Sequence, residues 1–383
     1  MKGDYVCIIE SMKADFKPFH PGRAFFFLIA FIAWILAGAV LKITAPVLLP
    51  FTISILLAFV MTPLVAFLEQ WHIPRIFSIL LAIGIIITGL YLIGIVLFSA
   101  GRTILTLYPK YEDRLTEIYI WVADFFELSY DAHLSFFENL WSQLGVRTRV
   151  RNLAFDLSNF FIGFLKDAVM VVLFVVFLLI EATYFKEKID LAFEKRAGQI
   201  KRIGADVMHQ VTRYLSAKFL ISLATGISVT LGLGFVGLEF AILWGVLQFI
   251  LNFIPNIGSI VVGVGATLFA LLQFWPEPTP IILVGIIMLS ANMIIGNVLE
   301  PMIMGDNLGI SPLIVLLALM IWGWLWGFMG MILAVPMMVI IQILCENIPI
   351  LEPLSILMGS RKAILAKQAK TKQPSAGRGE DGI

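Results

Sequence analysis

Long apolar runs separated by short polar segments make up most of the chain. About 20 apolar residues are enough to cross the roughly 30 Å hydrocarbon core of a membrane as a helix. Because lipid offers no hydrogen-bond partner to an open backbone, runs of this length must be helical. The pattern predicts an all-α, polytopic integral membrane protein with about eight membrane segments. The segments are Ala24–Leu41, Ala45–Leu68, Ile76–Ala100, Ala168–Ile180, Phe219–Phe235, Phe240–Trp275, Pro280–Leu299 and Pro312–Cys345.

Two apolar runs are too long for one crossing. Phe240–Leu272 and Pro312–Leu344 each hold about 33 residues, or roughly 50 Å of straight helix. The first is interrupted by Asn252–Gly258, with Pro255 inside it, and the second by Gly323, Gly327 and Gly330. Proline and glycine both weaken a helix interior. Each run is therefore either one kinked crossing or a re-entrant hairpin that returns to its own side.

The charge of the chain limits these alternatives. One hairpin alone would place the basic carboxyl tail outside, so there are none or two. With two, helix 216–236 plus a hairpin entered from outside is followed by helix 280–300 plus a hairpin entered from inside. This is an inverted repeat, as found in many secondary transporters. A shift of 72 positions places Gly258 on Gly330. We favour the paired hairpins, giving six spans plus two hairpins, with Phe240 and Leu272 on the same side.

The distribution of Lys and Arg predicts the topology. Basic residues gather in the amino-terminal tail, between Lys186 and Lys218, and in the carboxyl tail, whereas 101–167 is mildly acidic. Because cytoplasmic loops carry the excess of Lys and Arg, we expect both termini in the cytoplasm of a cell inner membrane. The predicted organisation is a cytoplasmic tail (1–23), three transmembrane helices (24–100), a periplasmic helical segment (101–167), a transmembrane helix (168–185), a cytoplasmic basic segment (186–215), a transport core with broken helices (216–346) and a partly disordered cytoplasmic tail (347–383).

Composition narrows the function classes. Of the residues, 60% are hydrophobic and 14% charged, and the net charge is +1. The two cysteines and four scattered histidines predict neither a disulfide nor a metal site. The chain has no Walker loop, nucleophile elbow or zinc spacing, and Gly232-x-Gly234-x-x-Gly237 ends a membrane span rather than a strand. We therefore expect no enzyme, no cofactor and no nucleic-acid partner. The expected partners are the lipid bilayer, a small-molecule or ion substrate, and further copies of the chain in a homo-oligomer.

Polar residues inside the apolar runs are the candidate site. Such groups are costly in a bilayer and mark substrate or ion pathways. Asn292, Gly296 and Glu300 follow each other at four-residue steps and so share a helix face. Two simpler interpretations stay open: the asparagines beside Pro255 bond only carbonyls freed by the proline, and Glu300 lies at the membrane interface. Glu181 and Glu239 are interpreted as interfacial and solvated. The candidate substrate-binding residues are Asn252, Pro255, Asn256, Gly258, Asn292, Asn297, Glu300 and Pro301.

The same residues resemble the autoinducer-2 exporter family, also called PerM-like permeases. The similarity lies in Asn252-Phe-Ile-Pro255-Asn256-Ile-Gly258 and Asn297-Val-Leu-Glu300-Pro301, and continues through Gly309-Ile-Ser311-Pro312, Trp322-Gly-Trp-Leu-Trp-Gly327 and Ala334-Val-Pro336. The resemblance implies a permease: some members are described as exporters of autoinducer-2 and others as sodium (or lithium)/proton antiporters.

Three functions follow from this sequence. The first is a gradient-driven or facilitative exporter of a small polar metabolite such as autoinducer-2, since amides and freed carbonyls suit a neutral, hydroxyl-rich solute. The second is a Na⁺(Li⁺)/proton antiporter in which Glu300 titrates between the two ions. The third is a non-transporting membrane scaffold. The polar breaks within the apolar runs argue against this third function.

Overall fold

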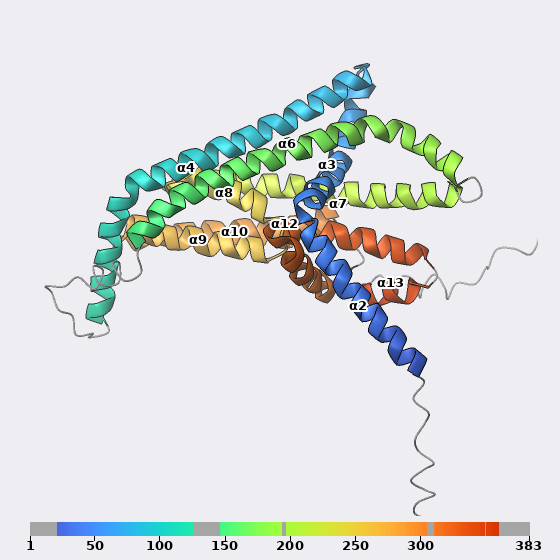
Figure 1. Ribbon diagram of the computed structural model, residues 1–383. Coiled ribbons are helices and arrows are strands. Elements are labelled where there is room, and N and C mark those ends of the chain that lie inside the picture. The colour runs from blue at the N-terminus through green and yellow to red at the C-terminus, as the bar shows by residue number, and fades with distance from the viewer. Residues whose placement is uncertain (1–20, 126–145, 194–196, 305–309, 349, 360–383) are drawn as a thin grey trace, which may run out of the picture. The chain divides into compact units, whose positions relative to one another are not determined.

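The computed structural model describes residues 21–125, 146–193, 197–304, 310–348 and 350–359 (Figure 1). Within these ranges the chain forms helices and one isolated bridge between Ile310 and Gly359. The all-α class predicted from the sequence is confirmed. The ends of the predicted tails, and residues 126–145 of the predicted periplasmic segment, lie outside the described residues.

The chain divides into two units at residue 48. The first unit contains α2 (Pro21–Ile43), an apolar helix with Lys42 in its last turn. The second unit begins within α3 (Ala45–Gln70) and contains all later helices.

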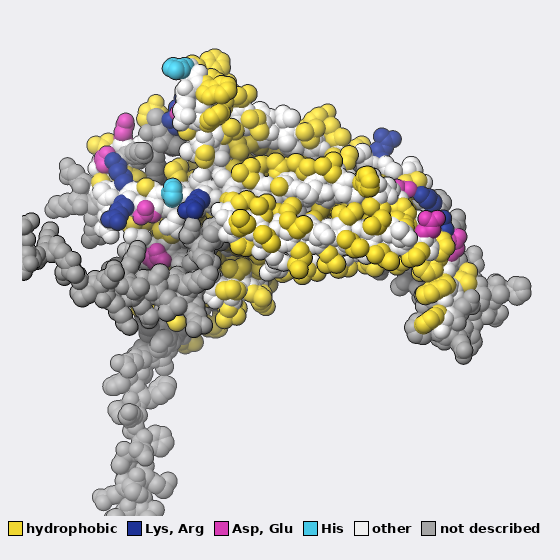
Figure 2. Space-filling view, turned by 180° about the vertical axis from the view of Figure 1, so that it is seen from behind, with side chains coloured by type: hydrophobic (Ala, Val, Ile, Leu, Met, Phe, Trp, Pro, Cys, Tyr) yellow, Lys and Arg dark blue, Asp and Glu magenta, His cyan; other side chains and the backbone are white. Residues whose placement is uncertain are grey.

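Six helices among the described residues are long and apolar enough to cross a membrane: Ala45–Gln70, Arg75–Ile104, Ala197–Val236, Ile257–Phe274, Pro278–Ile303 and Pro312–Asn347. Their outward side chains are apolar, as Leu231, Phe235 and Leu313 illustrate with 68%, 94% and 65% of their surface exposed. Figure 2 shows such apolar side chains gathered over the long helices, with the charged side chains toward the two ends of the apolar region. A surface of this kind is compatible with lipid and not with water. The chain is a multi-pass membrane protein.

Two helices extend well beyond a membrane's thickness. The helix α4 (Arg75–Phe125) has 51 residues and α6 (Val146–Ala192) has 47. Each would reach roughly 70 Å at 1.5 Å per residue, against a hydrocarbon core of about 30 Å. The boundary predicted at residue 100 therefore lies inside a continuous helix. A cluster that includes Ala58, Ala82, Ile83 and Val175 joins α3, α4 and α6.

The transport core predicted for 216–346 contains α7 (Ala197–Val236), α8 (Ala241–Leu251), α9 (Ile257–Phe274) and α10 (Pro278–Ala291). The π-helix η1 (Asn292–Leu299) and α11 (Glu300–Met304) continue α10, and α12 (Pro312–Asn347) follows. The short α13 (Glu352–Met358) contacts the start of α12, where the backbone N–H of Ser311 donates to Met358. Buried Val229, Val262, Ala266 and Val284 form the common core of α7, α9 and α10.

The first broken run is a helical hairpin. The rings of Phe240 and Phe269 are 5.6 Å apart, and Gln248 donates to the hydroxyl of Ser259. Residues 240 and 269 would be about 40 Å apart along one straight helix. The kinked-crossing alternative is therefore wrong for this run, and its two ends lie together. How deeply the turn enters a bilayer stays a prediction.

The turn of this hairpin depends on Gly258. A Cβ atom there would lie 1.7 Å from the carbonyl oxygen of Leu251. Only a residue without a side chain lets the second arm approach the end of the first so closely. Asn256, the residue before the second arm, has φ of 60° and ψ of −46°, close to a γ-turn, and the backbone N–H of Ile257 donates to the carbonyl oxygen of Pro255.

The second broken run bends sharply at the predicted glycines. Within α12 the backbone leaves helical geometry at Trp326 and at Gly327, where φ is 62° and ψ is −142°. A Cβ atom at Gly330 would lie 1.9 Å from the carbonyl oxygen of Trp322. Gly258 and Gly330, which the shift of 72 aligns, therefore occupy equivalent places after their breaks. This equivalence supports the internal repeat.

Candidate functional site

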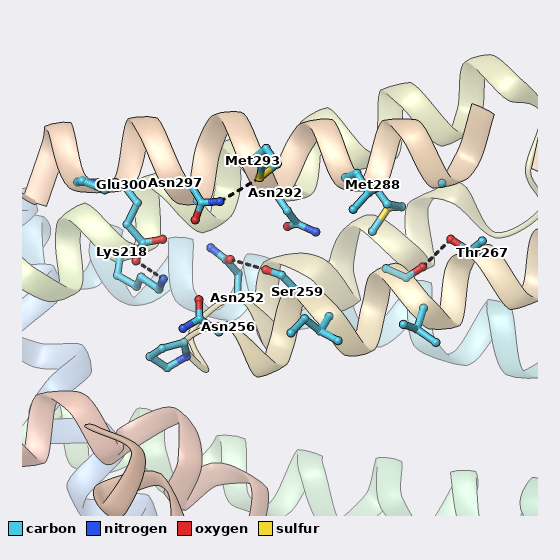
Figure 3. Close-up of a pocket in the computed structure, with 18 of the residues that line it drawn as sticks. Lys218, Asn252, Asn256, Ser259, Thr267, Met288, Asn292, Met293, Asn297 and Glu300 are labelled. Carbon is cyan, nitrogen blue, oxygen red and sulfur yellow. Dashed lines mark hydrogen bonds and ion pairs between the residues drawn. The ribbon is translucent and has the colours of Figure 1, made fainter. Parts of the chain in front are cut away.

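A cavity of about 930 Å³ lies beside the first hairpin (Figure 3). Its walls come from α7, the turn between α8 and α9, the helix α9, and the continuous segment α10–η1–α11. Seven of the eight predicted site residues line it: Asn252, Pro255, Asn256, Asn292, Asn297, Glu300 and Pro301. That they bind substrate stays a prediction. Gly258 does not line the cavity but shapes the adjoining turn.

The π-helix determines which residues of the α10–η1–α11 segment face the cavity. In an α-helix, Asn292 and Asn297 would point about 140° apart. In η1 the hydrogen bonds span five residues, and both asparagines line the cavity with Gly296 between them. Pro301 lies two residues after the end of η1, and a proline there has no N–H to donate and crowds the carbonyl one turn earlier. Such π segments are frequent at functional sites.

Amide and hydroxyl side chains connect the hairpin to its neighbours. Asn252 donates from Nδ2 to Ser222 Oγ at 3.0 Å and accepts from the Ser259 hydroxyl at 3.2 Å. Gln248 is fully buried and donates to both Ser259 and Asn292, at 3.1 and 3.2 Å. The interpretation that Asn252 bonds only freed carbonyls is wrong, because its partners are side chains.

Gln248 and Ser259 were missed by the sequence reasoning. A signal for Gln248 was present, because it precedes Asn252 by four residues and so shares its helix face. Ser259 gave no comparable signal.

An ion pair contributes the only charges among the residues that line this cavity. Lys218 Nζ lies 2.6 Å from Glu300 Oε1, and the two side chains are 3% and 25% exposed. Glu300 is thus a cavity residue. The charge pattern groups Lys218 with the cytoplasmic basic segment, whereas the structure buries it against a residue 82 positions later. Removing one partner of such a pair would leave a buried, uncompensated charge.

The remaining lining is apolar. Ile260, Val264 and Leu268 contribute from α9, and Met288 and Leu289 from α10. The cavity therefore joins polar amides and a neutralised charge pair to a hydrocarbon wall. A mostly apolar wall with a few polar groups is typical of small-molecule sites. Among the described residues, no group of three His, Cys, Asp or Glu side chains could hold a metal ion.

A second polar cluster lies at the mouth of the hairpin, where the sequence predicted a solvated Glu239. Its carboxylate instead accepts hydrogen bonds from Lys110, at 2.7 Å, and from Tyr111. Its backbone N–H donates to Gln273. Burial would raise the pKa of Glu239, but the hydrogen bonds from Lys110 and Tyr111 outweigh it and lower the pKa below its usual value. Glu181, in contrast, is exposed and paired with Lys188.

The sequence model of the family described as AI-2E family transporter matches residues 25–350 of this chain. A protein named putative transport protein from Borreliella burgdorferi is 39% identical over 54% of this chain and 57% of its own. The AI-2 transport protein TqsA of Escherichia coli is 29% identical over 73% of this chain and 80% of its own. A sodium-lithium/proton antiporter from Halobacillus andaensis is 30% identical over 50% of this chain and 53% of its own. The chain spans little more than half the length of the first of these relatives.

Proposed function

The chain belongs to the AI-2E family of transporters, and from this premise we propose that it exports a small, neutral, polar solute such as autoinducer-2. The chain is a multi-pass membrane transporter by its family and its helices. The proposal concerns the solute and the direction. It also places both termini in the cytoplasm of a cell inner membrane, on the strength of the Lys and Arg distribution.

The observation that carries the proposal is the cavity beside the first hairpin. Its charges are already paired, and four asparagines supply donors and acceptors in equal number. A neutral solute enters such a site without leaving a charge uncompensated. A volume of about 930 Å³ is at the upper end of the 300–1,000 Å³ typical of small-molecule sites.

Cation exchange is the second candidate, because one relative is named as an antiporter. In this chain Na⁺ would have to displace the ammonium of Lys218 from Glu300. Two unit charges about 4 Å apart repel by about 4 kcal/mol in surroundings of intermediate polarity. Bound Na⁺ beside a charged Lys218 is therefore disfavoured. If the protein is nevertheless an antiporter, Glu300→Gln abolishes Na⁺-dependent proton movement.

Transport into everted membrane vesicles tests the proposal, with autoinducer-2 and Na⁺ each examined under imposed gradients. Gly296→Leu is the informative variant, because a Cβ atom at Gly296 meets nothing within 4 Å and a longer side chain fills the cavity. Gly89→Leu is the matched control, since Gly89 is equally open but lies exposed on α4, outside the cavity.

We expect uptake of autoinducer-2 that Gly296→Leu lowers by about tenfold or more, because a blocked site cannot bind the solute, and that Gly89→Leu leaves unchanged. Equal uptake in both variants would remove the cavity from the transport path. Proton movement driven by Na⁺, without solute uptake, would replace the proposal by antiport. The expected homo-oligomer stays a prediction, which cross-linking in membranes tests.

A further inference from the structure

The Lys218–Glu300 pair has hydrogen-bonding capacity left over. An ammonium group has three N–H donors and a carboxylate has two acceptor oxygens. Within the described part of the chain, the ammonium of Lys218 donates only to Oε1 of Glu300, and Oε2 of Glu300 has no protein donor. Both residues line the cavity. Donors and an acceptor therefore lie next to each other at one place in its wall.

This arrangement discriminates between classes of ligand. An anion would be attracted by Lys218 but repelled by Glu300, and a cation would meet the opposite problem. A hydroxyl group is neutral and both donates and accepts. Two hydroxyls on adjacent carbons are held close together, so that one can accept from the ammonium while the other donates to the carboxylate.

We propose that the Lys218–Glu300 pair binds two adjacent hydroxyl groups of a neutral solute, and that this contact defines the substrate class as vicinal diols. The inference rests on the proposed function and deepens it. Hydrogen bonds to charged groups are stronger than neutral ones, so the pair is the main polar anchor. Asn252 and Asn256, from the hairpin turn, line the same cavity and hold further oxygens (Figure 3). The hydrocarbon skeleton lies against Ile260 and Met293.

Two polyols separate this contact from general polarity. Erythritol and pentaerythritol each carry four hydroxyls and no charge. All hydroxyls of erythritol stand on adjacent carbons, whereas no two of pentaerythritol do. Uptake of each, as a radiolabelled probe, is measured in proteoliposomes containing the full-length protein, and the ratio of the two rates is the readout. Using a ratio within one preparation cancels differences in the amount of inserted protein.

The variants are Lys218→Met, Glu300→Gln and the double variant Lys218→Met with Glu300→Met. The double variant removes both charges together and so avoids the buried unpaired charge that a single change can leave. Lys188→Met is the matched control, because Lys188 pairs with Glu181 in an exposed position outside the cavity. Size-exclusion profiles and unfolding temperatures show that each variant is folded.

Wild type and Lys188→Met should take up erythritol about tenfold faster than pentaerythritol. Pentaerythritol has no two hydroxyls on adjacent carbons, so it leaves the buried Lys218–Glu300 partners unpaired. In the three cavity variants the ratio should fall to about one. If wild type exports autoinducer-2 but takes up erythritol and pentaerythritol at about the same rate, the proposed function stands and the diol contact is overturned. A high ratio retained in the folded double variant also overturns it. Wild type that exports neither polyol nor autoinducer-2 contradicts the proposed function itself.

Discussion

Replacing Gly258 by alanine tests the hairpin most directly. The added Cβ atom would lie 1.7 Å from the carbonyl oxygen of Leu251 and 2.4 Å from its carbon. Real Cβ contacts essentially never fall below 3.0 Å, so the arms must separate by about 1.3 Å. The obstructing atoms belong to the backbone and cannot rotate away as a side chain could.

The expected cost follows from known overpacking. Inserting an atom into a well-packed interior costs about 1–3 kcal/mol, and a backbone obstruction belongs at the upper end. The alanine itself recovers at most about 1 kcal/mol, because glycine is a poor helix former. We expect a net loss of about 2 kcal/mol. Gly296→Ala is the matched control: its Cβ atom meets nothing within 4 Å, so only the helix-propensity gain remains.

The measurement is thermal unfolding of the purified proteins in one detergent, followed by intrinsic tryptophan fluorescence. Gly258→Ala should unfold at a clearly lower temperature than wild type, and Gly296→Ala at the same or a higher one. Gly330→Ala should behave like Gly258→Ala, since its Cβ atom would lie 1.9 Å from the carbonyl oxygen of Trp322. Equal unfolding temperatures for the alanine variants at 258 and 296 would refute the close approach of the two hairpin arms.

Three further outcomes are expected. Glu239→Gln should lower the unfolding temperature near neutral pH. The pKa of Glu239 is lower in the folded protein than its usual value of 4.5, so the carboxylate stabilises the fold at pH values above 4.5. This stabilisation is lost as the pH falls through the lowered pKa. A difference from wild type that stays constant into strong acid would show that the charge of Glu239 is irrelevant. Cysteine at Glu277, in a cysteine-free background, should react with an impermeant maleimide from the periplasmic side, and labelling from the cytoplasm alone would contradict the predicted orientation. Gly327→Ala should destabilise by about 1–3 kcal/mol, because φ of 62° with ψ of −142° is open essentially to glycine only; chemical denaturation that gives an unchanged midpoint would contradict this.

The sequence predicted the breaks and most of the cavity for a physical reason. Proline and asparagine in an apolar run are costly unless the backbone turns there, so Asn252 and Pro255 marked the hairpin. The four-residue steps from Asn292 to Glu300 marked a helix face. The inclusion of Asn297 on that face required the π-helix, and no periodicity in the sequence indicates where a helix widens.

Contacts between residues far apart along the chain could not be predicted from the sequence. Lys218 stands at the end of a basic segment and resembles its neighbours, and its partner is 82 positions away. Glu239 and Lys110 are 129 positions apart, and each alone resembles an ordinary surface charge. The extension of α4 past residue 100 was hidden as well, because a helix can leave the membrane without any break in its pattern.

The distance in sequence between Lys218 and Glu300 also orders events during synthesis. Lys218 is made 82 residues before its counter-ion, and at the usual 5–20 residues per second this leaves it without Glu300 for about 4–16 s. During that interval α7 carries an ammonium at the edge of its apolar part, which lipid does not accept. The part of α7 around Lys218 can therefore take its final place only after α10, η1 and α11 have emerged. Nascent chains that stop before residue 300 would keep Lys218 without its counter-ion.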